Sequence, residues 1–338
     1  MGGVVRAIAI VLLAGWALPG AAQTTLEAVK KRGQLLCGVD GTQPAFSLQN
    51  AAKEWSGMDV DLCRAVAAAV LGDARKVRFL TTTAQDRFTR LATGEFDILA
   101  HNATATLQRI AGTAVRFAVV TYYDGQGFVV PRSLNIDRLS SLQRAKICVE
   151  KGTTHELNMA AWFRTRQLAV EAVSFDVQDD MYAAYFAGRC LAVTSDATAL
   201  AASIVASGKA AAHLMLPDII SKEPLGPYVR QSDDQWLDIV RWTHYAMVQA
   251  EESGISQPSV DGDRLSPDPL IQRLLGVSSG NGKALGLDES WAYRVIKQVG
   301  NYGEMYDRNV GRNSPLKFER GINALWNNGG IMYAWPLR

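Results

Sequence analysis

The sequence predicts an α/β protein built from two units, each a mainly parallel sheet flanked by helices. Strand-like and helix-like segments alternate along the chain in two successive series, an order that favours parallel sheets with helices on their faces. The 338 residues are 48% hydrophobic, and at roughly 100–200 residues per domain this length predicts two domains with packed cores. The chain contains no internal repeat that would favour a different architecture.

Each segment is recognised by its pattern of apolar residues. Val60, Val66 and Val70 recur at helical spacing, whereas short β-branched runs bounded by polar residues are typical of strands. The first unit has strands at residues 34–39, 76–81 and 96–100, a helix from residue 59 and a helix at 84–94. The second has strands at residues 145–150, 171–175 and 191–196, a helix from residue 154 and a helix at 180–188.

The N-terminus carries the three parts of a secretory signal. Arg6 precedes the apolar run AIAIVLLAGWAL and small residues follow it, so we expect residues 1–22 to be a signal peptide cleaved after Ala22. The apolar run is shorter than the ~20 residues that span a membrane. Removing the segment lowers the formal net charge from +2 to +1. We therefore expect an exported monomer that neither inserts in a membrane nor binds nucleic acid.

Two charged residues follow two of the predicted strands. Arg109 closes the segment FDILAHNATATLQR, and its guanidinium can bind a carboxylate through two parallel hydrogen bonds. Asp196 closes GRCLAVTSD and is an acceptor suited to an ammonium group. Ligands of such sheets bind at the C-terminal ends of the strands. Together the two residues predict a receptor for a zwitterion, although each alone is equally well explained as a solvated surface residue.

A second anion site is predicted in the segment VEKGTTHELN. Gly152 allows a tight turn, and Thr153 with Glu156 has the spacing of a capping box. The free amides of the helix start, with the hydroxyls of Thr153 and Thr154, are suited to a carboxylate. An ordinary helix cap explains the same residues.

Export gives the four cysteines a structural role, because an oxidising compartment allows them to pair. Of the three possible connectivities, Cys37 with Cys63 and Cys148 with Cys190 keeps each bridge inside one unit. Crossed pairs would tie early and late parts of the chain together, and free buried thiols are the remaining alternative. We expect the two local bridges.

Catalytic and metal-binding patterns are sparse. The four histidines show no metal-ligand spacing, no serine lies in a nucleophile-elbow context, and no phosphate loop is present. His155 and Glu150 are candidates for acid–base groups, but solvated residues at a helix start are the simpler interpretation. We expect no enzyme activity, no cofactor and no metal.

The segment GMDVDLCRAVAAAV resembles the signature of periplasmic polar amino acid-binding proteins, the solute-binding protein family 3 of ABC importers. Long runs such as EKGTTHELN and VGNYGEMYDRNVGRNSPLKFERGINALWNNGGIMYA resemble its general L-amino acid-binding subfamily, over nearly the whole mature chain. The resemblance implies a two-lobed periplasmic binding protein of type II with two hinge strands. It places lobe 1 at residues 24–125 plus 218–338 and lobe 2 at 126–217.

The same resemblance implies a function in the periplasm. The protein would capture an L-amino acid or amino acid-like solute between its lobes and deliver it to an ABC permease with its ATPase. Arg109 stands where an arginine holds the α-carboxylate, and Asp196 where an aspartate takes the α-amino group. The other ligand positions that it assigns are Asp40, Asn102, Thr104, Thr153 and Thr154.

Several positions depart from the family pattern. The subfamily usually has an arginine where His101 stands, a tryptophan at Ala105 and an aspartate at Ile110. Gln43 and Ala84 occupy positions where shorter relatives stack the ligand on aromatic rings. These departures leave open which solute binds. An exported enzyme of the same fold, similar to cyclohexadienyl dehydratase, and a ligand-sensing subunit are the alternative functions.

Overall fold

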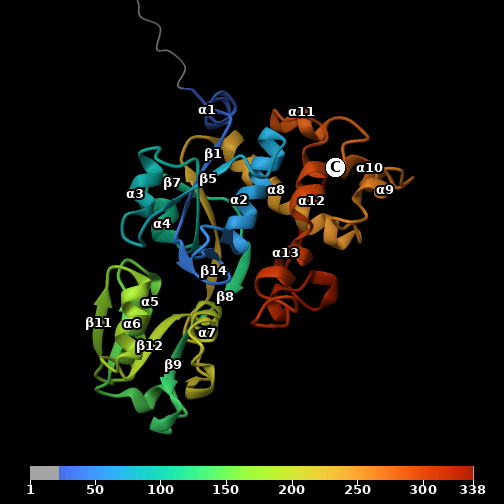
Figure 1. Cartoon of the computed structure of the whole chain (residues 1–338). Coiled ribbons are helices and arrows are strands. Elements are labelled where there is room, and N and C mark those ends of the chain that lie inside the picture. The colour runs from blue at the N-terminus through green and yellow to red at the C-terminus, as the bar shows by residue number, and fades with distance from the viewer. Residues whose placement is uncertain (1–22, 338) are drawn as a thin grey trace, which may run out of the picture.

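A computed structural model describes residues 23–337, so the predicted signal peptide lies outside the described residues. Figure 1 shows two lobes, an upper one coloured blue to teal and gold to red, and a lower one coloured green to yellow. Each lobe contains one large sheet with helices against it. Within residues 23–337 no helix is long and apolar enough to cross a membrane.

The sheet of lobe 1 has the strand order β5-β1-β6-β14-β7, and β8 pairs with β14. Strand β1 is parallel to β5 and β6, as predicted, whereas β14 runs antiparallel to β6, β7 and β8. The elements are α1 (Thr25–Arg32), β1 (Leu35–Val39), β2 (Thr42–Gln43), β3 (Ser47–Gln49), β4 (Trp55–Ser56), α2 (Met58–Leu71), β5 (Val77–Thr81), α3 (Arg87–Ala92), β6 (Ile98–Thr104), α4 (Leu107–Gly112), β7 (Val115–Phe117), β8 (Tyr122–Asp124) and β14 (Glu223–Arg230).

The sheet of lobe 2 has the strand order β11-β10-β12-β9-β13. Its parallel strands are β10, β11 and β12, and β9 adds to them in the antiparallel direction. The elements are β9 (Gln126–Pro131), η1 (Arg132–Leu134), η2 (Leu139–Leu142), β10 (Lys146–Glu150), α5 (Thr154–Thr165), β11 (Glu171–Phe175), α6 (Gln178–Phe186), β12 (Ala192–Asp196), α7 (Ala197–Ala206), η3 (Ala210–Ala212) and β13 (His213–Met215).

The C-terminal helices extend the core of lobe 1. Helix α2 is buried on nearly every side, because α8 and α12 pack against it. After Arg64 it is apolar all round, as expected for a buried helix. The last segment also returns to the sheet, where Asn323 bonds the backbone of Tyr123 in β8. The elements are α8 (Asp234–Glu252), α9 (Val260–Asp263), α10 (Pro269–Leu274), α11 (Asn281–Leu285), α12 (Trp291–Val299), α13 (Tyr302–Asn309), η4 (Gly321–Asn323) and η5 (Trp326–Asn328).

Two segments of the chain cross between the lobes and lie against each other. The first passes from β8 to β9 through Gly125, and the second passes from β13 to β14. A Cβ atom on Gly125 would lie 2.3 Å from a side-chain carbon of Ile219, so a larger residue cannot fit there. Ile220 N donates to Gln126 O at 3.1 Å, which joins the two crossing segments.

Both local disulfides are present, Cys37–Cys63 in lobe 1 and Cys148–Cys190 in lobe 2. Their sequence separations are 26 and 42 residues, which correspond to about 3.5 and about 4 kcal/mol of loop-closure stabilisation. Because each bridge stays within one lobe, neither restricts movement of one lobe relative to the other.

Peptide mapping of the non-reduced protein is expected to recover these two linked pairs. Reduction should lower the stability of each lobe by a few kcal/mol, because the unfolded chain regains loop entropy. Thermal melts with and without reductant measure this change. Linked peptides that join Cys37 to Cys148, or Cys63 to Cys190, would contradict the assignment.

Candidate functional site

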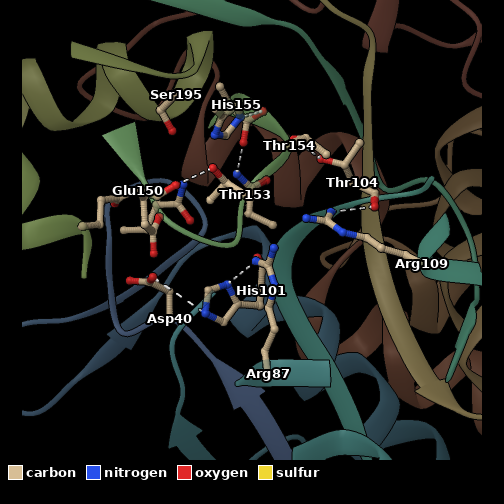
Figure 2. Close-up of a pocket in the computed structure, with 14 residues that line it drawn as sticks. Asp40, Arg87, His101, Thr104, Arg109, Glu150, Thr153, Thr154, His155 and Ser195 are labelled. Atoms are coloured by element: carbon tan, nitrogen blue, oxygen red, sulfur yellow. Dashed lines mark hydrogen bonds and ion pairs between the residues drawn. The ribbon is translucent and has the colours of Figure 1, made fainter. Parts of the chain in front are cut away.

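The two sheets present the C-terminal ends of β6, β10 and β12 to a chamber between the lobes, which we call the inner chamber (Figure 2). Its volume is about 20 Å³, close to the space that one water molecule needs. Every described residue that lines it is polar or charged. The lining residues are Asp40, Gln43, Arg87, His101, Asn102, Thr104, Arg109, Glu150, Thr153, Thr154, His155, Gln178, Ser195 and Asp196.

All seven residues that the sequence assigns to the ligand line this one chamber. They come from both lobes, because Asp40, Asn102, Thr104 and Arg109 precede the first crossing segment and the other three follow it. The structure therefore brings the predicted residues together. Their contact with a ligand stays a prediction.

Arg109 lies in the first turns of α4, whose N-cap residue Thr106 accepts from the backbone N–H of Arg109 at 3.2 Å. The guanidinium donates to Thr104 O at 2.9 Å and to Gly152 O, in the other lobe, at 3.4 Å. It also lies over the ring of Phe88, at 5.2 Å from the centroid. Burial lowers the pKa of Arg109, but an arginine stays charged at neutral pH. These contacts hold the guanidinium group at the wall of the inner chamber.

Asp196 ends β12 and faces lobe 1. Its carboxylate accepts from Asn102 Nδ2 at 2.9 Å, a bond between the lobes, and lies 3.1 Å from His155 Nε2. Burial alone would lower the pKa of His155, but the adjacent Asp196 carboxylate outweighs burial and raises it. The carboxylate is therefore surrounded by hydrogen-bond donors, as a buried acidic group requires.

Asn102 owes its position to an irregularity in β6. Its backbone φ is 47°, in the left-handed region that asparagine tolerates, and the pairing of β6 with β14 shifts register nearby. Its N–H donates to the buried carboxylate of Asp59 at 2.7 Å. The sequence predicted that this strand ends at residue 100, but it continues to Thr104, because β14 pairs with its last residues.

A second group of charges lies at the other end of the inner chamber, around His101 (Figure 2). Arg87 Nη1 lies 3.1 Å from His101 Nδ1, and His101 Nε2 lies 2.9 Å from Thr82 O. These partners assign the neutral tautomer with its proton on Nε2, and burial followed by the Arg87 charge lowers the pKa of His101. Asp40 lies 3.8 Å from the ring and accepts from Thr42.

The pKa values of Glu150 and Arg87, which also line the inner chamber, are shifted as well. Burial, followed by the charge of Asp40, raises the pKa of Glu150 to about 7. Burial, followed by the charge of Arg109, lowers the pKa of Arg87 to about 10, so Arg87 remains a cation at neutral pH. Sequence reasoning missed Arg87, whose place in an amphipathic helical segment resembled that of a surface residue.

Glu223 is a further buried carboxylate that sequence reasoning missed. It stands at the start of β14, on the second crossing segment, and accepts from Thr104 Oγ1 at 2.6 Å and from Thr154 Oγ1 at 3.0 Å. Asn158 Nδ2 donates to its other oxygen at 2.9 Å. Glu223 thus joins Thr104 of lobe 1 to helix α5 of lobe 2. Nothing in the sequence around Glu223 indicated that this residue would be buried between the lobes.

The predicted capping box at the start of α5 is wrong. Thr153 is the N-cap residue, but its hydroxyl donates to Glu150 O at 2.7 Å, and no side-chain cap bond forms. Glu156 accepts from Ser174 Oγ at 2.8 Å instead of reaching back to the cap. Consequently the first amides of α5 have no side-chain cap at the end that faces the inner chamber.

His155, Asp196 and Glu223 have the spacing of metal ligands, with ligand atoms within 4.8 Å of one another. Their partners favour another interpretation. Glu223 accepts from three hydroxyl groups and an amide, and Asp196 from Asn102 and His155. These carboxylates suit an ammonium group, which needs several acceptors, and we assign no metal to the group.

A two-lobed α/β protein whose two halves enclose a buried polar chamber is built to bind a small solute between its lobes. The comparisons with known proteins identify the class more closely. The profile of the bacterial extracellular solute-binding proteins, family 3, matches residues 35–256. The chain belongs to this family, and its C-terminal helices extend beyond the match.

Two relatives align along almost the whole chain. The chain is 49% identical over 320 residues to the "General L-amino acid-binding periplasmic protein AapJ" of Rhizobium johnstonii, with 94% of each chain covered. It is 44% identical over 329 residues to the "Glutamate/glutamine/aspartate/asparagine-binding protein BztA" of Rhodobacter capsulatus, with 97% of each chain covered.

A solved structure shares the architecture. It is an "ABC transporter / periplasmic binding protein from Brucella ovis with glutathione bound", 46% identical, with a TM-score of 0.91. The match covers 94% of this chain and 100% of that one. The type II periplasmic binding protein fold is thereby confirmed, including the C-terminal extension that the family profile leaves out.

We expect Glu150→Gln to stabilise the protein at pH 8 and to have little effect near pH 4.5. The raised pKa means that the folded protein keeps a proton that the unfolded chain releases, so stability falls as the pH rises from about 4.5 to about 7. The glutamine side chain does not titrate, so the variant avoids this loss of stability, which is at most about 3 kcal/mol. Thermal melts at both pH values measure it, with Glu171→Gln, an exposed residue of the same lobe, as the control. Equal effects of both variants would contradict the prediction.

Proposed function

We propose that this protein is the periplasmic substrate-binding component of an amino acid ABC transporter. It captures an L-amino acid or an amino acid-like solute between its lobes and delivers it to a membrane permease and ATPase. The observation that carries the proposal is the placement of the half-buried Arg109 and the buried Asp196 at one chamber between two lobes. The names of the two full-length relatives, both binding proteins, support a receptor rather than an enzyme.

The two ends of a zwitterion match these two residues. A guanidinium has five N–H donors, and Arg109 uses two of its nitrogens on the carbonyls of Thr104 and Gly152. The remaining donors suit an α-carboxylate. At Asp196, an α-ammonium group would replace the hydrogen bond with Asn102. The hydroxyl groups of Thr153 and Thr154 line the same chamber as Arg109 and would lie near the α-carboxylate of the ligand.

The rest of the inner chamber favours a polar side chain on the ligand. Arg87 offers a cationic donor there, and Asp40 and Glu150 offer acceptors. Burying an aliphatic or aromatic group against such a lining would leave these groups without partners, at a cost of about 1–3 kcal/mol each. The four amino acids named for the Rhodobacter relative and the glutathione of the Brucella structure are polar solutes of this type.

Binding requires the lobes to move. The chamber of about 20 Å³ is too small to admit an amino acid while the lobes are closed. We keep the limits of lobe 1 at residues 24–125 plus 218–338 and of lobe 2 at 126–217, because the strand membership of the two sheets changes at these points. The hinge then lies in the two crossing segments.

The location and the partners follow from the same proposal. Export through residues 1–22 would place the protein in the periplasm, where its two disulfides are stable. Both lobes would then be available to a permease, to which the closed form presents the two lobes in a fixed relation. We propose that the protein acts as a monomer without a cofactor.

Arg109→Ala is expected to weaken binding of glutamine or glutamate by about 3–5 kcal/mol, the scale for leaving a buried charge without its partner. Calorimetry on the purified protein measures the loss. Arg116→Ala, which removes an exposed arginine of the same lobe, is the matched control and should leave binding unchanged. If Arg109→Ala binds within twofold of the parent, the assignment of the carboxylate is wrong.

Small-angle scattering is expected to show a smaller radius of gyration at saturating glutamine or glutamate. The reason is that bonds between the lobes, such as Asn102 to Asp196 and Gln85 to Asp176 at 2.9 Å, form only in the closed arrangement. Gln85→Ala removes one such bond outside the inner chamber and should shift the unliganded protein further toward the open form. An unchanged radius in the parent would contradict hinge closure.

A further inference from the structure

A larger chamber adjoins the inner one on the other side of Arg109, and we call it the outer chamber. Its volume is about 550 Å³, within the range of about 300–1,000 Å³ typical of small-molecule sites. It lies between the lobes and is lined from both. The lining residues are Ala84, Gln85, Phe88, Thr106, Gln108, Arg109, Thr113, Gly152, Thr153, Thr154, Glu156, Leu157 and Asn158.

The two chambers share a wall. Arg109, Thr153 and Thr154 line both of them. The bond from Arg109 Nη2 to Gly152 O, which is long at 3.4 Å, closes this wall across the lobes. A ligand carboxyl carbon held at Arg109 would therefore lie on the border of both chambers. Any group attached beyond it has the outer chamber as its nearest space.

The chemistry of the outer chamber differs from that of the inner chamber. It has an apolar surface formed by Ala84, Phe88 and Leu157, and amide groups from Gln85 and Asn158. Leu157 is 67% exposed although it is large and aliphatic. A mixture of apolar surface and amides suits a peptide unit, which has a polar backbone and a compact side chain.

The two lobes are in contact at the edge of the outer chamber. Ala84 of lobe 1 is 3% exposed, and a Cβ atom on Gly152 of lobe 2 would lie 3.1 Å from the carbonyl oxygen of Ala84. Both residues line the outer chamber, and Gly152 has little room for a larger side chain at this contact.

We propose that the outer chamber is a second subsite and that the protein takes short α-linked peptides of two or three residues. One residue lies in the inner chamber with its ammonium group at Asp196, and the next lies against Phe88 and Leu157. This inference rests on the proposed function, because it uses Asp196 for the ammonium group of the first residue and Arg109 for its carbonyl oxygen. A γ-linked peptide keeps its α-carboxylate at Arg109 and extends from its side chain, so it does not enter the outer chamber by this route and serves as the comparison.

Calorimetry with three probes tests the proposal: glutathione as a γ-linked peptide, alanyl-glutamine as an α-linked one, and glutamate as a single residue. The variant is Leu157→Trp, whose larger ring narrows the outer chamber, and Leu157 does not line the inner one. Because Leu157 is exposed, its replacement leaves the core intact. Leu134→Trp is the control, since Leu134 is an exposed leucine of the same lobe that lines neither chamber.

The parent protein is expected to bind alanyl-glutamine, and Leu157→Trp should weaken that binding at least tenfold, whereas any binding of glutathione should change less than twofold. Glutamate binding should change less than twofold, and Leu134→Trp should change nothing. Binding of glutamate with no binding of alanyl-glutamine would overturn the second subsite and leave the proposed function intact. So would equal losses of peptide affinity in both tryptophan variants. A protein that binds neither these peptides nor any of the twenty amino acids would overturn the proposed function itself.

Discussion

The structure depends on one constraint, that charges buried between two lobes must be paired by groups from both lobes. Asp196 of lobe 2 accepts a hydrogen bond from Asn102 of lobe 1. Glu223, on the second crossing segment, accepts hydrogen bonds from hydroxyl groups of both lobes. A buried carboxylate without donors costs several kcal/mol. The arrangement of the two lobes is therefore specified mainly by polar groups at the interface, whereas the apolar cores lie within the lobes, except that Ala199 of α7 packs into the core of lobe 1.

This constraint also explains how the same residues can serve a ligand. The donors and acceptors that face one another across the inner chamber are those that an amino acid presents in complementary form. A solute with an ammonium group and a carboxylate can replace the contacts between the lobes at little cost in unpaired groups. In the function proposed above, closure and recognition use one set of side chains, so changes in this set are expected to affect affinity and the balance between open and closed forms together.

Much of the fold could be predicted from local pattern. The parallel strands and the helices between them follow from periodicity, and the bridge of each lobe follows from the position of its cysteines. The antiparallel addition of β14 was not predictable, because strands from distant parts of the chain pair through backbone groups that have no sequence signature. For the same reason the extension of β6 to Thr104 was missed.

The candidate site also contains residues that the local sequence predicts and residues that it does not. That Arg109 and Asp196 meet at one chamber was predictable because each lies at or after the end of a strand, where side chains of separate strands converge. Arg87 and Glu223 were not, since their role depends on burial that only the packed lobes create. The capping box failed because Ser174 on the neighbouring strand offered Glu156 a better partner. Long-range partners override local motifs wherever both are within reach.

The attachment of the C-terminal segment to β8 has a practical consequence. Asn323 holds the backbone of Tyr123 two residues before Gly125, and Thr25 near the N-terminus bonds Asp233 at the start of α8. Both ends of the described chain are thus anchored on lobe 1. If the lobes close as proposed, a pair of fluorophores fused to the two termini would keep a constant separation. An optical sensor made from this protein needs one of its labels on the other lobe, for example on the outer surface of α7.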